Sequence, residues 1–148
     1  MKAKDILDVK GRKIFSISEM ATVFDAVDEL TKYQIGLLIV KNAAGTIVGV
    51  ISERDIVKKW IHQKKEPITM IVRNVMTQRE VLVAAAEEDD IQTIMNVMTE
   101  KRIRHVPIFR GMELTGIISI GDIVKNLLEI KEYEIRTLIE YVSGNYPR

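Results

Sequence analysis

A short polar motif occurs twice in the chain. The pattern Gly-h-h-Ser-x-x-Asp, in which h is apolar, places Ser52 before Asp55 and Ser119 before Asp122. Each copy joins an apolar segment to the start of a helical pattern. A serine at the N-cap with an acid three residues later is typical of a capping box. An aspartate at a helix start can also accept hydrogen bonds from the two neighbouring hydroxyls of a ribose. The motif therefore predicts either two helix caps or two nucleotide sites.

Basic residues lie near both copies of the motif. Arg54 lies inside the first copy and, with the N–H groups of the helix start, suits a phosphate. Gly121 takes that position in the second copy, where Arg102, Arg104 and His105 offer positive charge instead. A charge in a strand that enters an apolar core needs a partner, which favours a ligand-binding role for Arg104 over a solvated surface position. His105 is either a hydrogen-bonded, partly buried residue or part of a site.

The usual arrangements for catalysis and metal binding are missing from the sequence. It has no cysteine, only two histidines, and neither a P-loop, a GxGxxG nor a His-Glu-x-x-His motif. We therefore predict no catalytic residues, no metal site and no required cofactor. With 22 basic and 21 acidic residues, the composition favours neither nucleic acid nor a membrane surface as a partner. The absence of a signal peptide and of a membrane-length apolar run predicts a cytoplasmic protein.

An internal repeat positions the two motifs. The serines lie 67 residues apart, and so do the aspartates. Apolar residues at helical spacing also recur, as Val23, Ala26, Val27 and Leu30 and again as Ile91, Ile94, Met95 and Met98. We expect strands near 13–17, 35–40 and 47–51, with counterparts that include 81–85 and 103–108. Each repeat then runs strand, helix, strand, turn, strand, helix.

The repeat predicts an α/β (α+β) fold of two β-α-β-β-α repeats, packed with pseudo-twofold symmetry. We divide the chain into a first repeat at 1–63, a polar linker at 64–71, and a second repeat with a long C-terminal helix at 72–148. The two related halves would cover the faces of each other's small sheets and leave clefts where they join.

Three segments resemble tandem CBS domains, the family named after cystathionine beta-synthase, in which a pair is often called a Bateman module. They are the doubled Gly-h-h-Ser-x-x-Asp-h-h-Lys motif, the segment 75–77 and the segment 102–108. The resemblance covers residues 5 to 125. It implies that the clefts bind AMP, ADP, ATP, NAD(H) or S-adenosylmethionine. The motif aspartate would hold the ribose, while hydroxyl and basic side chains would hold phosphate and strand backbone would read the adenine.

The resemblance implies a set of binding residues in each repeat. The first site would comprise Ser16, Gly36, Leu37, Ser52, Arg54 and Asp55. The second would comprise Val83, Arg102, Arg104, His105, Pro107, Ser119 and Asp122. The alanines at 84–86 replace the Ser16-Ile17-Ser18 of the first repeat, so a contact from that strand is expected to be lost. Gly121 weakens the expected phosphate site in the same way.

These observations predict a sensor that binds an adenine nucleotide, catalyses nothing and controls a separate partner protein. Two alternatives remain open: a structural dimerisation adaptor with degenerate pockets, and a module that binds S-adenosylmethionine. We also predict a homodimer, because the C-terminal helix carries an apolar stripe that continues beyond the repeat. The stripe includes Leu127, Ile135, Leu138 and Ile139.

Overall fold

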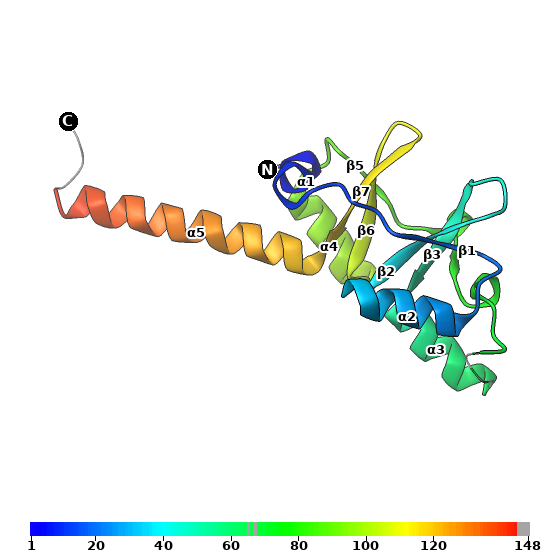
Figure 1. Ribbon diagram of the computed structural model, residues 1–148. Helices are drawn as coiled ribbons and strands as arrows, with labels where there is room; N and C mark the ends of the chain where they lie inside the picture. The colour runs from blue at the N-terminus through cyan, green and yellow to red at the C-terminus, as the bar shows by residue number, and fades with distance from the viewer. Residues whose placement is uncertain (65, 67, 145–148) are drawn as a thin grey trace. The chain divides into compact units, whose positions relative to one another are not determined.

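The computed structural model describes residues 1–64, 66 and 68–144 (Figure 1). Lys65 and Pro67 of the predicted linker lie outside the described residues. The chain divides into two compact units. One is Lys13–Ala84, and the other combines Met1–Arg12 with the chain from Ala85 onward.

The unit Lys13–Ala84 is built around a four-stranded sheet in the order β1-β2-β3-β4. Strands β1 and β2 are parallel, and the other two neighbouring pairs are antiparallel. Its elements are β1 (Ser16–Ser18), α2 (Val23–Tyr33), β2 (Leu37–Lys41), β3 (Ile47–Ser52), α3 (Glu53–Gln63), the 3-10 helix η1 (Val72–Asn74), β4 (Thr77–Gln78) and the 3-10 helix η2 (Arg79–Val81).

The other unit has a three-stranded sheet in the order β5-β6-β7, with β5 parallel and β7 antiparallel to β6. Its elements are α1 (Ala3–Lys10), β5 (Ala85–Ala86), α4 (Ile91–Lys101), β6 (His105–Arg110), β7 (Glu113–Ser119) and α5 (Ile120–Val142). The predicted long C-terminal helix is thus confirmed as α5, of 23 residues. None of the helices among the described residues is long and apolar enough to cross a membrane.

Local sequence signals explain where the helices begin. Thr22 caps α2 and forms a capping box with Asp25. Asp90 caps α4 by accepting a hydrogen bond from the backbone N–H of Gln92. The hairpin between β2 and β3 contains Gly45 with φ of 80°, a conformation that glycine adopts without strain.

Each unit has its own apolar core. In the unit Lys13–Ala84, Val23 and Ala26 of α2 pack with Leu38 of β2 and Ile51 of β3. The core of the other unit joins the buried stripes of α1 and α4 to β6, β7 and α5, through Ala3, Ile6, Leu7, Ile91, Ile94, Met98, Val106, Ile108, Ile118 and Ile123.

The compact units do not follow the division of the sequence into repeats. Helix α1 begins the first repeat, yet it packs on β7 and α5 in the unit that holds the second motif (Figure 1). Conversely, residues 72–84 follow the linker but belong to the unit of the first motif. Helix α1 packs in the unit of the second motif because the spacing of Ala3, Ile6 and Leu7 gives it a fully buried face.

The first strand of each repeat begins later than its pattern indicates. Strand β1 covers Ser16–Ser18, and β5 covers only Ala85–Ala86. Residues Arg79–Val81, just before and at the start of the expected strand near 81–85, form η2 instead.

Candidate functional site

The first motif forms the junction between β3 and α3. Ser52 is the N-cap of α3, and its Oγ accepts a 3.2 Å hydrogen bond from the backbone N–H of Asp55. In return, Asp55 Oδ2 accepts 3.0 Å hydrogen bonds from the backbone N–H and from the hydroxyl of Ser52. The capping interpretation of the motif is therefore confirmed in this repeat, and it holds the aspartate side chain in a defined position.

A third residue reaches the same carboxylate. Thr77 of β4 donates a 3.0 Å hydrogen bond from Oγ1 to Oδ1 of Asp55. Thr77 can approach because β4 pairs with β3, where the motif begins with Gly49. A Cβ atom at Gly49 would lie 2.2 Å from the carbonyl oxygen of Thr77. The glycine of the motif is thus required by the close approach of β4.

Backbone of the preceding strand completes the junction. Leu37 at the start of β2 is buried and lies opposite Ser52 in the sheet. The carbonyl of Gly36 accepts a 3.3 Å hydrogen bond from the backbone N–H of Glu53. The structure therefore brings Gly36 and Leu37 together with the first motif.

The two remaining residues of the predicted first site are exposed. Ser16 begins β1 and lies opposite Ile39, two residues along β2 from Leu37. Arg54 lies in the first turn of α3, next to Asp55 in sequence. Both can therefore be reached from solvent.

The second motif repeats this geometry between β7 and α5. Ser119 caps α5, and its Oγ accepts a 3.2 Å hydrogen bond from the backbone N–H of Asp122. Asp122 Oδ2 accepts a 2.8 Å hydrogen bond from the backbone N–H of Ser119. His105 at the start of β6 is half-buried and lies opposite Ser119. The carbonyl of Arg104 accepts a 2.8 Å hydrogen bond from the backbone N–H of Ile120, as Gly36 does in the first repeat.

The other predicted residues of the second site are more scattered. Pro107 is buried in β6 opposite Ile117, and Arg102 is the C-cap of α4 in the left-handed conformation, with φ of 55°. Arg104 is exposed, so burial does not demand a partner for its charge. Val83 belongs to the unit Lys13–Ala84, not to the unit that holds the rest of the second site.

The electrostatic setting of Asp122 differs from that of Asp55. Lys10, the last residue of α1, places its Nζ 2.5 Å from Oδ2 of Asp122 and also donates a 2.8 Å hydrogen bond to the carbonyl of Ile117. Burial would raise the pKa of Asp122. However, the hydrogen bonds from Lys10 and Ser119 outweigh burial, so its pKa lies below the ordinary value.

The residues Thr77 and Lys10, which contact the motif aspartates, were not among the predicted site residues. They lie 67 residues apart, the same separation as Asp55 and Asp122. Extending the repeat backward from the motifs would have paired them, but it would not have shown that each reaches an aspartate. Among the described residues, no group of three or more His, Asp or Glu side chains is placed to hold a metal ion.

Comparison with known proteins agrees with this geometry. The model of the CBS domain matches residues 3–62 and 72–129. The chain therefore belongs to the CBS-domain family, and the predictions of a tandem CBS pair and of its fold class are confirmed. CBS pairs are generally regulatory modules.

Individual relatives support the same assignment. A mitochondrial CBS domain-containing protein of Arabidopsis thaliana is 32% identical over 127 residues, which are 84% of this chain and 62% of the relative. A crystal structure of a CBS-domain containing protein from Agrobacterium tumefaciens is 35% identical, with a TM-score of 0.78 over 84% of this chain and 91% of the other. A CBS domain protein from Pyrobaculum aerophilum complexed with AMP is 25% identical, with a TM-score of 0.70 over 82% of this chain and 89% of that one.

Proposed function

We propose that this chain is a regulatory module that binds an adenine ribonucleotide through its motif aspartates and passes the signal to a separate protein. The observation that carries the proposal is the position of Asp55. Its carboxylate lies at a strand-to-helix junction, fixed by Ser52 and Thr77, and the exposed Arg54 precedes it in the first turn of α3. The AMP complex of the similar Pyrobaculum aerophilum protein supports the same ligand class. The predicted cytoplasmic location belongs to this proposal.

Asp55 retains the capacity to bind a ribose. An ionised carboxylate offers about four lone-pair positions. The contacts from Ser52 and Thr77 take three of them. If a ribose hydroxyl replaced the Ser52 hydroxyl as donor to Asp55, a second lone-pair position would become available for the ligand. The hydrogen bond from the Ser52 backbone N–H, which belongs to the cap, would remain.

The charge beside the aspartate favours a phosphate-bearing ligand over S-adenosylmethionine. Both ligands present an adenosine, so the ribose contact does not separate them. Arg54 is a cation in the first turn of α3, where helix N–H groups also favour anions. S-adenosylmethionine carries a sulfonium cation and no phosphate. We therefore expect AMP, ADP, ATP or NAD(H) to bind more tightly.

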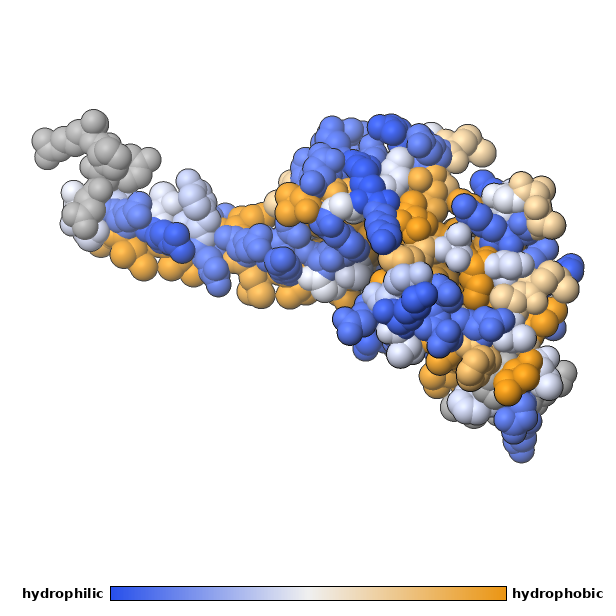
Figure 2. Space-filling model, viewed as in Figure 1, coloured by the Kyte–Doolittle hydropathy of each residue, from blue (hydrophilic) through white to orange (hydrophobic). Residues whose placement is uncertain are grey.

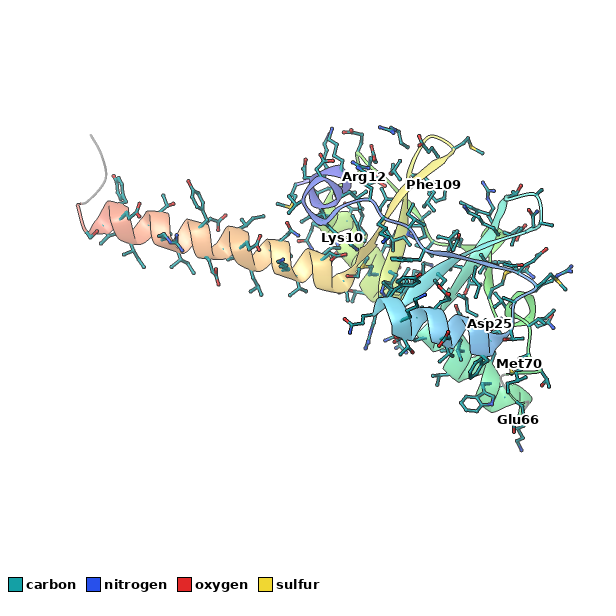
Figure 3. All side chains as sticks on the ribbon, in the orientation of Figure 1. Lys10, Arg12, Asp25, Glu66, Met70 and Phe109 are labelled. Carbon is teal, nitrogen blue, oxygen red and sulfur yellow. The ribbon has the colours of Figure 1, made fainter. Side chains whose placement is uncertain are left out.

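The test is calorimetry with AMP, ATP, NADH and S-adenosylmethionine on the wild type and on Asp55→Asn. Loss of a charge-assisted hydrogen bond costs roughly 1.5–3 kcal/mol, so Asp55→Asn should weaken AMP binding about tenfold or more. The matched control is Asp25→Asn. Asp25 forms the same type of capping box, with Thr22 at the start of α2, and lies outside the motif (Figure 3).

Each outcome is informative. If Asp55→Asn and Asp25→Asn both bind AMP like the wild type, the motif is only a helix cap and the ribose role is wrong. If the wild type binds 2′-deoxy-AMP as tightly as AMP, the ribose hydroxyls are not recognised. Mass spectrometry of small molecules that remain bound through purification would identify the natural ligand.

The second part of the proposal is a homodimer formed through α5. The apolar residues Ile135 and Leu138 of this helix are 57% and 62% exposed. With Val124, Leu128 and Val142 they recur at intervals of three, four and seven residues, which is typical of a helix that pairs with another helix. Figure 2 shows apolar side chains along α5. This stripe also favours the alternative function, a dimerisation adaptor.

Light scattering on the wild type and on Leu138→Glu tests the dimer. We expect a dimer at micromolar concentration that Leu138→Glu converts to a monomer, because a charge cannot be buried in a helix pair without a partner. Arg136→Glu, an exposed charge reversal on the same helix, is the control. A monomeric wild type would contradict the dimer. A dimer that binds none of the four ligands would favour the adaptor over the sensor.

A further inference from the structure

The two motif aspartates receive their additional hydrogen bond from chemically different donors. Asp55 receives it from the neutral hydroxyl of Thr77, at 3.0 Å. Asp122 receives it from the ammonium of Lys10, at 2.5 Å, as an ion pair. Thr77 and Lys10 lie at the same separation as the two aspartates, so they occupy equivalent positions in the two units. The chemical difference between these two additional donors therefore rests on one residue in each unit, Thr77 in one and Lys10 in the other.

The position of the Lys10 ammonium is fixed by two acceptors. Besides Asp122, its Nζ donates to the carbonyl oxygen of Ile117 in β7, at 2.8 Å. The backbone of Lys10 is also fixed, because α1 buries Ile6 and Leu7 in the core of the same unit. The Lys10 side chain is nevertheless 38% exposed, and that of Asp122 is 23% exposed. The ammonium can therefore leave the carboxylate for solvent without unfolding α1.

An ion pair changes what the carboxylate can bind. A ribose hydroxyl carries no charge, whereas the Lys10 ammonium forms an ion pair with Oδ2 of Asp122 and neutralises the charge of the carboxylate. A ribose hydroxyl that donates to Asp122 must therefore displace the ammonium, or bind a carboxylate that the ion pair has made a weaker acceptor. A ribose that binds Asp55 meets no such competitor at Thr77. The pKa of Asp122 lies below its ordinary value partly because of Lys10, which agrees with a paired carboxylate.

We propose that Lys10 is an intramolecular competitor for the ribose position at Asp122, so that the two motifs bind adenine ribonucleotides with unequal affinity. The site at Asp55 fills first, and the site at Asp122 fills at higher ligand concentration, because the ion pair with Lys10 weakens Asp122 as an acceptor until the ammonium is displaced. This inference rests on the proposed nucleotide function, and it gives a single chain two concentration ranges of response.

The test isolates the second site in a background of Asp55→Asn and measures AMP binding by calorimetry. Lys10→Met keeps an apolar side chain close to the aliphatic stem of lysine in length and removes the ammonium. If the pair is closed for about nine-tenths of the time, its removal should tighten binding at Asp122 about tenfold, because affinity scales with the competent fraction. A further Asp122→Asn substitution should abolish the gain. Lys4→Met is the matched control: Lys4 also lies on α1 and is paired, with Glu88 at 2.7 Å, but does not contact the motif.

A reciprocal variant tests the same idea in the first unit. Thr77→Lys places an ammonium at the equivalent position, so in a background of Asp122→Asn it should weaken AMP binding at Asp55. This variant does not alter the packing of α1, and it therefore tests the inference even if Lys10→Met unfolds.

The outcomes separate the inference from the proposed function. The inference is overturned if AMP binds at Asp55 but Lys10→Met leaves the second site unchanged. It is also overturned if Lys10→Met weakens AMP there, because Lys10 would then be a phosphate ligand. Absence of AMP binding in the wild type and in Lys10→Met would overturn the proposed function, and the inference with it.

Discussion

Replacement of Gly116 by alanine tests whether α1 is an integral part of the unit that holds the second motif. Gly116 lies in β7, at the position equivalent to Gly49 of the first motif. An added Cβ atom would lie 2.6 and 2.9 Å from the two methyl carbons of Leu7. Leu7 is fully buried, so its side chain cannot turn into solvent to make room.

The magnitude follows from the type of contact. Insertion of a methyl group into a well-packed core costs about 1–3 kcal/mol, which we expect for Gly116→Ala. Leu7→Ala should cost about 2–5 kcal/mol through lost burial and the cavity that remains. In the double variant, the new methyl group occupies part of the space that Leu7 leaves. The double variant should therefore be more stable than the sum of the two changes by about 0.5–3 kcal/mol.

Gly49→Ala is the informative comparison. Its Cβ atom would meet the backbone carbonyl of Thr77 at 2.2 Å. Truncation of a side chain cannot relieve a clash with backbone, so we expect the cost of Gly49→Ala to persist in a background of Met76→Ala. We thus expect truncation of the neighbouring side chain to relieve the destabilisation at Gly116 but not at Gly49.

The assay is urea unfolding followed by circular dichroism for the wild type, both single variants and the double variant. The reasoning is refuted if Gly116→Ala has wild-type stability, because α1 would then not pack on β7 as described. Strict additivity of Gly116→Ala and Leu7→Ala would also refute it, because the two side chains would then share no space.

Three further predictions concern charge and helix stability. Lys10→Met should raise the pKa of Asp122, since burial then acts with one opposing hydrogen bond fewer; carbon NMR titration measures it, and an unchanged pKa would contradict the ion pair. The pKa of Glu87 is lowered from the ordinary 4.5, mainly by its hydrogen bond with Arg12. Its contribution to stability is therefore present above pH 4.5 and is lost as the pH falls through the lower folded-state pKa. Glu87→Gln should therefore reduce stability at pH 7 and flatten the acid limb of a melting-temperature profile, and an unchanged profile would count against this contribution. Gly121→Ala should increase the free energy of unfolding by about 0.5–1 kcal/mol and so raise the melting temperature, because the added Cβ atom would make only an ordinary 3.6 Å contact with Ser119. A lower melting temperature would show that the glycine is required there.

The sequence predicted those parts of the fold that depend on local signals. The capping pairs at Ser52 and Ser119 and the start of α2 at Thr22 follow from residue types within one helical turn, and the structure has all three. The repeat also predicted which backbone segments meet each motif. Leu37 and His105 lie opposite the two serines because the hairpin register is set by the turns.

The parts that the sequence did not predict depend on long-range packing. Helix α1 has eight residues and a three-residue buried face, which is too short a pattern to identify its partner. Its position in the unit of Asp122 is decided by Leu7 against Gly116, residues more than a hundred positions apart. At Arg104 only the premise about burial was wrong: the residue lies just before β6 and is exposed, so the prediction that it binds a ligand stays a prediction.

Residues 1–12 belong to the unit of the second motif, and residues 72–84 belong to the unit of the first motif. This exchange explains why the motif contains a glycine as well as a serine and an aspartate. Serine and aspartate alone suffice for the cap, which closes without help from elsewhere. The glycine is needed only because another segment passes close by: β4 at Gly49 and α1 at Gly116. The same two segments deliver Thr77 and Lys10 to the aspartates. A substitution at either residue would change the charge next to a motif aspartate while the cap that orients its carboxylate stays intact. If the aspartates bind nucleotide as proposed, the affinity of each site can be adjusted independently of the stability of the helix on which it is built.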